Sequence, residues 1–348
     1  MTTALVVDDS HFMRTVISDI LENGGVEVAD TAANGKQAVK KVEEVDPDVV
    51  TMDVEMPEMN GIEAVEAITD RHPTPILMLS ALTTEDADAT LEAMEKGAVD
   101  TFAKPGGTIS TELSGHSEEL VAAVERVAAA DPTAGNDVEQ SAPTTSTPAT
   151  DADYVDHPTL LVGASTGGPN VVESILGALP READFRVLVV QHMPDQFTSR
   201  FAKRLDQTSE YDISEAEDGD RISGGEGLVA RGDYHMQVSG YSNGRLRVRL
   251  DQGERRHSVR PAIDVTMESA AERVTDPLVA VVLTGMGTDG ADGVRAVKEA
   301  GGATFAQDEA TSAVFGIPER AIETGCVDEV LPADRLTEAI TDSIRRSS

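Results

Sequence analysis

The sequence predicts an α/β protein with two doubly wound domains joined by a flexible linker. In both halves, short runs rich in β-branched residues alternate with amphipathic helical patterns, which is typical of parallel sheets covered by helices. Residues 131–157 are rich in Pro, Ser, Thr and Asp and offer little for a core. The length of 348 residues also favours two separate cores. We therefore expect domains at 1–127 and 155–348, with an acidic linker at 128–154.

Repeated strand and helix patterns in the first half predict a five-stranded parallel sheet. Ser10 precedes the helical run FMRTVISDILENGG, which its terminal glycines stop, and Thr84 precedes EDADATLEAMEKGA. Serine and threonine are good N-caps because their side chains can accept a bond from an unpaired helix amide. The predicted strands lie at 4–8, 26–31, 47–53, 75–80 and 99–104.

The same alternation returns after the linker and predicts a second α/β sheet. Between its second and third core strands, YHMQVSGYSNGRLRVRL alternates apolar and polar residues around Asn243-Gly244, a dipeptide typical of two-residue hairpin turns. We expect an antiparallel flap or edge there, and a closing amphipathic helix at 333–346. The predicted core strands lie at 159–165, 185–192, 277–285 and 303–307.

Composition excludes several classes of protein. Asp and Glu number 63 against 28 Lys and Arg, so the formal charge is −35 and the surface repels nucleic acid. No apolar run approaches the roughly 18 residues of a membrane span. Met1–Ser10 lacks the basic start of a signal peptide, and Cys326 is the single cysteine. We expect a cytoplasmic protein without membrane insertion, and the acid excess is typical of salt-loving organisms.

Polar side chains at the ends of the first set of strands predict an acidic site. The functional crevice of a doubly wound sheet lies beyond the carboxyl ends of its strands, where Asp8, Asp9, Asp53 and Lys104 fall. Three carboxylates repel one another unless a cation joins them, and Mg²⁺ prefers such oxygen ligands. Asp53 ends the central strand and is best placed to attack a phosphoryl group, whose charge Lys104 would neutralise.

Residues 3 to about 127 resemble the receiver domain of two-component response regulators, which has a flavodoxin-like (βα)5 fold. The resemblance implies that Asp53 is the phosphate acceptor and that Asp8 and Asp9 hold Mg²⁺ with it. It also implies a switch formed by Ser80, Phe102 and Lys104, and a cis bond before Pro105. Taken singly, Asp8 and Asp9 are equally compatible with a helix cap, and Lys104 with a solvated side chain. The resemblance rests on all of these residues together.

The second half contains a strand, a glycine-rich turn and a helix around a serine. Gly163, Ser165 and Gly167 match the GxSxG spacing of a nucleophile elbow, although similar turns also bind phosphates and dinucleotides. The strand FRVLVVQH delivers His192 and the segment VVLTGMGTDGADG delivers Asp289, both beyond strand ends. We expect Ser165 to attack, His192 to move its proton and Asp289 to orient the ring.

Neighbouring residues complete this predicted triad of Ser165, His192 and Asp289. Backbone amides near Ser165, at Thr166, and near Met286 are candidates for an oxyanion hole and wall. His235 and His257 are rival bases, but a lone histidine in a hairpin is more often structural. Zinc hydrolysis is disfavoured because the sequence has no HExxH motif.

The motifs GASTGGP, QHMP and LTGMGTDGADG resemble the CheB family of chemotaxis methylesterases. The resemblance implies a serine hydrolase that converts γ-glutamyl methyl esters of chemoreceptors to glutamate and methanol, and that commonly deamidates receptor glutamines. It implies no cofactor for this reaction, phosphorylation by the chemotaxis kinase CheA, and a receiver that covers the active site until it is phosphorylated. The segment ARGDYHM at 230–236 departs from the family's usual proline-glycine turn.

Three other functions stay open at this point. A receptor-binding adaptor without turnover is disfavoured by the complete set of triad residues. A receiver-controlled esterase for small molecules would be expected to carry a hydrophobic lid, which the sequence does not suggest. A DNA-binding response regulator would need a basic face or a helix-turn-helix pattern, and neither is present.

Overall fold

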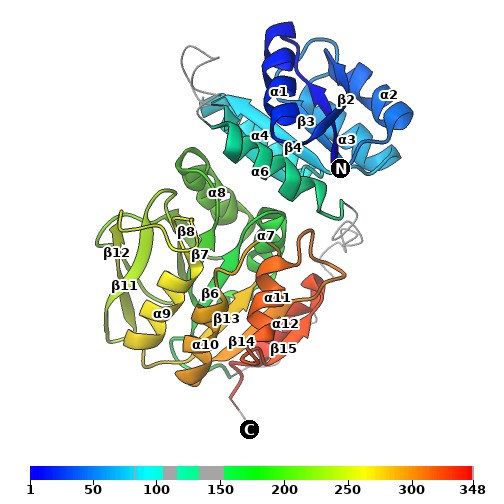
Figure 1. The fold of residues 1–348 in the computed structure, drawn as a ribbon. Coiled ribbons are helices and arrows are strands. Elements are labelled where there is room, and N and C mark those ends of the chain that lie inside the picture. The colour runs from blue at the N-terminus through cyan, green and yellow to red at the C-terminus, as the bar shows by residue number, and fades with distance from the viewer. Residues whose placement is uncertain (82–83, 105–115, 133–152, 347–348) are drawn as a thin grey trace. The chain divides into compact units, whose positions relative to one another are not determined.

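The computed structural model describes residues 1–81, 84–104, 116–132 and 153–346 and divides the chain into two compact units, Met1–Asn136 and Asp137–Ser348 (Figure 1). Each unit has its own sheet and core. The expected domain limits, 1–127 and 155–348, stay predictions, and most of the expected linker at 128–154 lies outside the described residues.

The N-terminal unit contains a parallel sheet of five strands in the order β2-β1-β3-β4-β5. This arrangement confirms the predicted doubly wound fold, because the chain begins at an inner strand and then builds outward in both directions. Apolar residues fill both faces of the inner strands, as expected for a sheet covered on both sides. The strands are β1 (Thr3–Val7), β2 (Glu27–Ala32), β3 (Val49–Asp53), β4 (Ile76–Ala81) and β5 (Asp100–Lys104).

Helices cover both faces of this sheet, with α1 beside α6 and α2 beside α3. The Ser10 hydroxyl accepts a bond from Met13 N at 3.4 Å, which confirms the predicted cap of α1. At the start of α3, Asn60 and Glu63 form a capping box. The helices are α1 (His11–Asn23), α2 (Gly35–Val45), α3 (Gly61–Arg71), α4 (Thr84–Glu95) and α6 (Ser117–Ala128).

The C-terminal unit is built on a seven-stranded parallel sheet in the order β15-β14-β13-β6-β7-β10-β8. The four predicted core strands correspond to β6, β7, β13 and β14, and β6 pairs with β7 as their sequence order suggests. The short strands β8, β10 and β15 were not predicted. The strands are β6 (Thr159–Ala164), β7 (Arg186–Gln191), β8 (Asp212–Glu215), β10 (Glu226–Val229), β13 (Leu278–Val282), β14 (Ala303–Gln307) and β15 (Glu329–Leu331).

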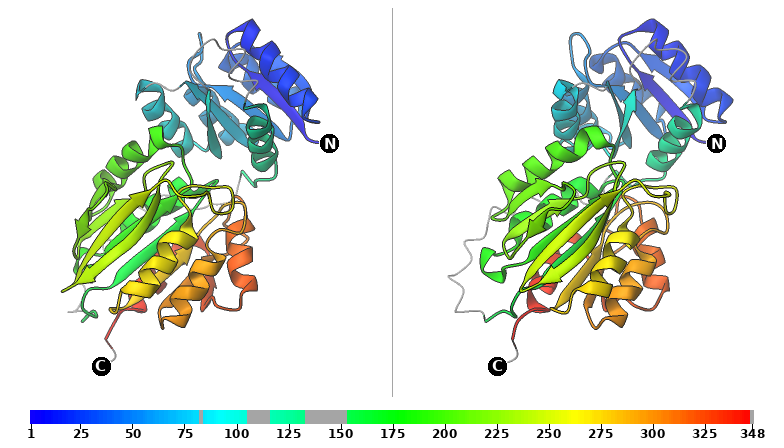
Figure 2. Two further views of the ribbon diagram at one scale, coloured as in Figure 1. Left: turned by 60° about the vertical axis from the view of Figure 1, so that its left-hand side comes forward. Right: turned by 90° about the vertical axis from the view of Figure 1, so that its left-hand side faces the viewer.

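The predicted antiparallel flap forms a separate three-stranded sheet in the order β11-β12-β9. Strands β11 (His235–Ser242) and β12 (Arg245–Asp251) are joined at Asn243-Gly244, where both residues have positive φ. Strand β9 (Arg221–Ile222) pairs with β12. The flap is not an isolated edge, because β11 packs against helix α9 (Ile263–Arg273) and shares its core (Figure 2).

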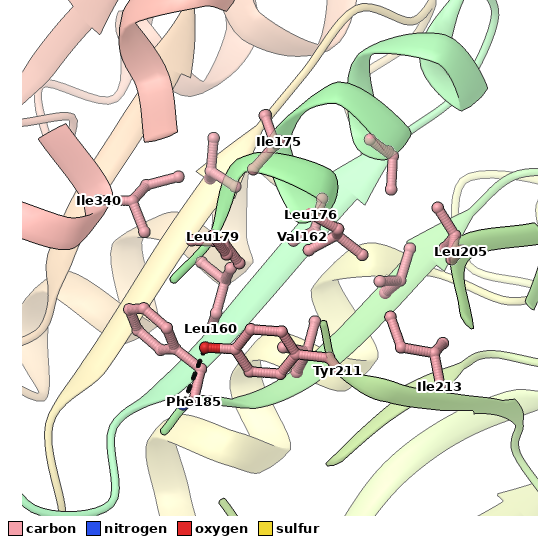
Figure 3. Packing of buried hydrophobic residues seen from close by; sticks show 14 of the residues in the cluster. Leu160, Val162, Ile175, Leu176, Leu179, Phe185, Leu205, Tyr211, Ile213 and Ile340 are labelled. Carbon is pink, nitrogen blue, oxygen red and sulfur yellow. Dashed lines mark hydrogen bonds between the residues drawn. The ribbon is translucent and has the colours of Figure 1, made fainter. Parts of the chain in front are cut away.

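Two apolar clusters, one on each face, pack the C-terminal sheet against the elements that cover it. One cluster packs α7 (Gly168–Ala178), α8 (Asp195–Thr208) and α12 (Ala333–Asp342) against one face of the sheet (Figure 3). The other packs α9, α10 (Ala291–Glu299), α11 (Gly316–Glu323) and the antiparallel sheet against the opposite face. A short 3-10 helix spans Arg181–Ala183, and no helix of the described residues is long and apolar enough to span a membrane.

Candidate functional site

The predicted acidic side chains meet at the carboxyl edge of the N-terminal sheet. Asp8 follows β1 and Asp53 ends the adjacent strand β3, so the topology brings both to the same place. One oxygen from each of Asp8, Asp9 and Asp53 lies within 4.8 Å of the other two. Asp8 is buried, Asp53 is half-buried and Asp9 is exposed.

Lys104 links the two inner carboxylates of this acidic site. Its Nζ lies 2.6 Å from Asp53 Oδ1 and 2.9 Å from Asp8 Oδ2. Burial raises the pKa of Asp53 to about 6, although Lys104 acts in the opposite direction. Burial alone would lower the pKa of Lys104, but the charges of Asp53 and Asp8 outweigh burial and raise it.

The chemistry of the acidic site fits Mg²⁺. Three carboxylates face a single ammonium group, so the site keeps an excess of negative charge and hard oxygen donors. Asp8 also accepts a bond from Ser10 N at 2.9 Å, which fixes the orientation of its carboxylate. Asp8, Asp9 and Asp53 are therefore the residues that would hold the ion.

The predicted switch residues lie on neighbouring strands beside the acidic site. Ser80 is buried on β4 and pairs with Ala103 on β5, while Phe102 is partly buried and pairs with Leu79. Ser80 therefore lies on the strand next to β3, and Phe102 lies on the edge strand beyond it. Pro105, for which a cis bond was expected, lies outside the described residues.

The residues of the predicted triad follow three consecutive strands of the C-terminal sheet. Ser165 follows β6 and His192 follows β7, while Asp289 lies in the loop after β13, on the other side of β6. Because parallel strands end at one edge of a sheet, all three residues lie at that edge. The structure joins His192 Nε2 to Asp289 Oδ2 at 2.9 Å.

Asp289 is buried and its carboxylate is held by the start of α9. Oδ2 accepts a bond from Ile263 N at 2.6 Å and Oδ1 accepts one from Asp264 N at 3.0 Å. Burial opposes ionisation of Asp289, but the hydrogen bonds and charge of His192, together with the two amides, outweigh it. The pKa of Asp289 therefore lies below its usual value, and the carboxylate is poised to stabilise a protonated His192 ring.

Ser165 lies in a tight turn that only small neighbours permit. Gly167 has φ of +76° at the N-cap of α7, and a Cβ added to Gly285 would lie 2.6 Å from Ser165 Cβ. Gln191 Nε2 donates to Ser165 O at 2.8 Å and to His192 O at 3.3 Å, which ties two triad residues together through their backbones. Within the described chain, the Ser165 hydroxyl makes no hydrogen bond to the His192 ring.

The residues predicted for the oxyanion hole and wall flank this turn. Ser165 N donates to Thr284 O at 3.0 Å, so the amide of Ser165 itself is committed to the fold. Thr166 is buried and its carbonyl accepts a bond from the Thr284 hydroxyl. The Met286 side chain is 40% exposed, which leaves it accessible to a bound substrate.

The two rival histidines have other partners. His235 is buried, and its Nδ1 accepts a bond from Ala262 N at 3.2 Å while its Nε2 lies 2.9 Å from Glu254 O. Both nitrogens of His235 are thus used by the fold. His257 Nε2 lies 2.8 Å from Asp264 Oδ2, so this ring pairs with a different carboxylate.

Sequence reasoning missed Gln191 and Asp264. Gln191 directly precedes His192 in the QHMP motif, and its polar side chain at the end of an apolar strand was the available signal. Asp264 lies in the first turn of an amphipathic helix, where an acidic residue is common for reasons of helix polarity. Its closeness to Asp289 depends on tertiary packing and leaves no local signal.

Comparison with known proteins identifies relatives over the whole chain. Residues 160–340 match the family model described as CheB methylesterase, and residues 4–111 match the response regulator receiver domain. Protein-glutamate methylesterase/protein-glutamine glutaminase of Halobacterium salinarum is 80% identical over 100% of both chains. The protein of that name from Haloarcula marismortui is 56% identical over 98% of this chain and 97% of its own.

A solved structure supports the likeness of the C-terminal unit. The CheB methylesterase catalytic domain of Thermotoga maritima is 41% identical, with a TM-score of 0.51. The match covers 54% of this chain and 98% of that domain.

We expect Asp53→Asn to raise the free energy of unfolding by about 1–2 kcal/mol near pH 7 without Mg²⁺, because ionised Asp53 is buried beside like charges. The pKa of Asp53 is about 6 in the folded chain, against an ordinary value of 3.8. The unfavourable effect of ionisation is therefore present above about pH 6 and is lost as pH falls toward about 4. Calorimetry across this range should show the two proteins converging at low pH.

The matched control is Asp19→Asn, which removes an exposed carboxylate from α1. It should change the free energy of unfolding by no more than about 0.5 kcal/mol at any pH. An Asp53→Asn protein less stable than wild type at neutral pH would show that the bond from Lys104 outweighs burial.

Proposed function

Because the chain belongs to the CheB methylesterase family, we propose that it hydrolyses γ-glutamyl methyl esters on methyl-accepting chemoreceptors under the control of its receiver domain. The same site would convert selected receptor glutamines to glutamate, in agreement with the names of the relatives. The observation that carries the proposal is the hydrogen bond from His192 to a buried Asp289, next to the strand end that bears Ser165.

The first half of the reaction uses Nδ1 of the His192 ring, the nitrogen that does not face Asp289. Since Nε2 faces Asp289, Nδ1 is the nitrogen that accepts the Ser165 proton as the serine oxygen attacks the ester carbonyl. The bond to the methoxy oxygen then breaks, and His192 returns the proton so that methanol leaves. The product of this half is a glutamyl ester of Ser165.

The second half repeats the same proton transfers with water. His192 accepts a proton from water as the water oxygen attacks the Ser165 ester, and the serine oxygen then takes that proton as it leaves. Amides of Thr166 and Met286 are the proposed donors to the negatively charged oxygen of each tetrahedral intermediate. A glutamine substrate follows the same steps, with ammonia leaving in place of methanol. The protein's own side chains supply every proton transfer, so we propose that the ester reaction uses no cofactor.

Control of the esterase depends on the acidic site. A receiver domain implies Mg²⁺-dependent phosphorylation, and Asp53 is the proposed acceptor, with Asp8 and Asp9 beside it. When bound, Mg²⁺ would neutralise charge on the phosphoryl group and on the carboxylates. Lys104 lies 2.6 Å from Asp53 and would pair with a phosphoryl oxygen, and Ser80 and Phe102 would transmit the change. We propose the chemotaxis kinase CheA as the phosphodonor.

Receptor membranes that carry labelled methyl esters provide the direct test. We expect the full chain to release labelled methanol, and acetyl phosphate with Mg²⁺ to raise the rate at least about fivefold. Asp53→Asn should keep the basal rate and lose the increase, because its side chain cannot form an acyl phosphate. Binding of the chain to receptors without any methanol release would instead favour an adaptor.

Asp289→Asn tests the role of the buried carboxylate. We expect kcat for methanol release to fall about ten thousandfold, because the neutral amide neither stabilises a protonated His192 ring nor fixes its tautomer. KM should change little, since Asp289 is buried behind His192. A variant with kcat within tenfold of wild type would show that His192 does not need Asp289.

A further inference from the structure

Asp264, in the first turn of α9, binds the start of α10, and Asp289, just before α10, binds the start of α9. Asp264 Oδ1 accepts bonds from Gly290 N at 2.9 Å and Gly293 N at 2.7 Å, at the start of α10. In return, Asp289 accepts bonds from the first two amides of α9. The N-cap residues of these helices, Ala262 and Gly290, provide no side-chain cap of their own. The two carboxylates therefore replace the missing caps reciprocally.

His257 holds the other side of the same loop. Its Nε2 lies 2.8 Å from Asp264 Oδ2, and its Nδ1 lies 3.1 Å from the Thr288 hydroxyl. Thr288 and Gly290 are the two neighbours of Asp289 in the chain. His257 and Asp264 therefore bind the loop on both sides of Asp289. Met286, the proposed wall residue, belongs to the same loop.

The surroundings of Asp264 raise its pKa above the usual value for an aspartate. Burial and the charge of Asp289 cause this increase, and the amide of Gly293, His257 and Arg256 oppose it only in part. Arg256 Nη2 lies 3.5 Å from Asp264 Oδ2.

Arg256 is itself held in place by two outer carboxylates. It binds Glu268 at 2.5 Å and Asp292 at 3.1 Å. His257, Asp264 and Asp289 have ligand atoms within 4.8 Å of one another, but amide donors already occupy both acidic side chains. This cluster is therefore better suited to holding the loop around Asp289 in place than to binding a cation.

The backbone at His257 is strained in a way that supports a positional role. His257 has φ of +51° and Ser258 has φ of +65°, two successive residues with side chains in the left-handed region. Such conformations persist only where surrounding contacts hold them, and they gather at functional sites. Here the contacts are those from the His257 ring to Asp264 and Thr288.

We propose that Asp264 and His257 are positioning residues, which hold the loop around Asp289 so that its carboxylate faces His192. The inference rests on the proposed ester hydrolysis and extends it beyond the triad. Neither residue touches the reacting atoms, so each acts through Asp289 and its loop.

Asp264→Asn is the first test. The variant keeps one oxygen for the α10 amides but loses the charge and the bond from His257. We expect kcat to fall about tenfold to a hundredfold, the range expected for a small misplacement of a catalytic group. We also expect the acidic limb of the kcat/KM profile to move to lower pH, because one negative charge that favours protonated His192 is gone.

Asp292→Asn is the matched control for this charge change. Asp292 also binds Arg256, but it is half-buried at the outer end of the cluster, pairs with Arg295 and, among the described residues, makes no hydrogen bond to the loop. Its kcat and pH profile should stay within about twofold of wild type. If Asp264→Asn behaved like this control, the proposal would be wrong.

Substitutions of His257 keep the proposal testable if Asp264→Asn does not fold. His257→Ala removes the ring, whereas His257→Gln keeps an amide donor that can reach Asp264. We expect the Ala variant to lose about tenfold in kcat and the Gln variant to recover most of that loss. Equal activity of the Ala variant and wild type would overturn the role of His257.

The rate at which a fluorophosphonate labels Ser165 separates this inference from the proposed function. This reaction needs the ordered triad but no receptor. If wild type is labelled at Ser165 without releasing methanol from receptors, the proposed function fails while the inference is still tested. Slower labelling of Asp264→Asn, at unchanged folded content, supports the inference, and labelling at the wild-type rate contradicts it.

Discussion

The hydrogen bond between His192 and the buried Asp289 is the interaction on which the account of the C-terminal unit depends. It joins residues 97 positions apart in the chain, from loops after β7 and β13. Strand β6 lies between these two strands and is followed directly by Ser165. A change in strand order, or in the length of either loop, would separate the imidazole from its carboxylate. The fold of the sheet is therefore a precondition for the chemistry.

Both units place carboxylates at the carboxyl edge of a parallel sheet, but their surroundings shift the carboxylate pKa in opposite directions. At the acidic site, three carboxylates face one lysine, and burial raises the pKa of Asp53. At the triad, amides and His192 surround Asp289 and keep its pKa low. The first arrangement leaves a place for a cation and a phosphoryl group. The second fixes one ionised carboxylate behind an imidazole, which suits proton transfer.

Much of this organisation could be predicted from local patterns. Long apolar strands and the residues just beyond them, including Asp53, Ser165 and His192, are visible because strand ends are marked by turns and caps. Strands β8 and β10 were missed because they have four residues each and lack a clear alternating pattern. The roles of Asp264 and His257 were not predictable, since they arise from contacts between distant loops, whereas Gln191 carried a signal as a polar residue at the end of an apolar strand. Motif resemblance could indicate the triad but not the residues that hold it.

Substitution of the nucleophile tests the central claim most directly. Methanol release from methylated receptors by Ser165→Ala should be compared with wild type at equal protein and phosphodonor concentration. We expect kcat to fall at least about a thousandfold, with receptor binding retained. Release of methanol at the wild-type rate would show that another group performs the attack and would contradict the assignment of the site.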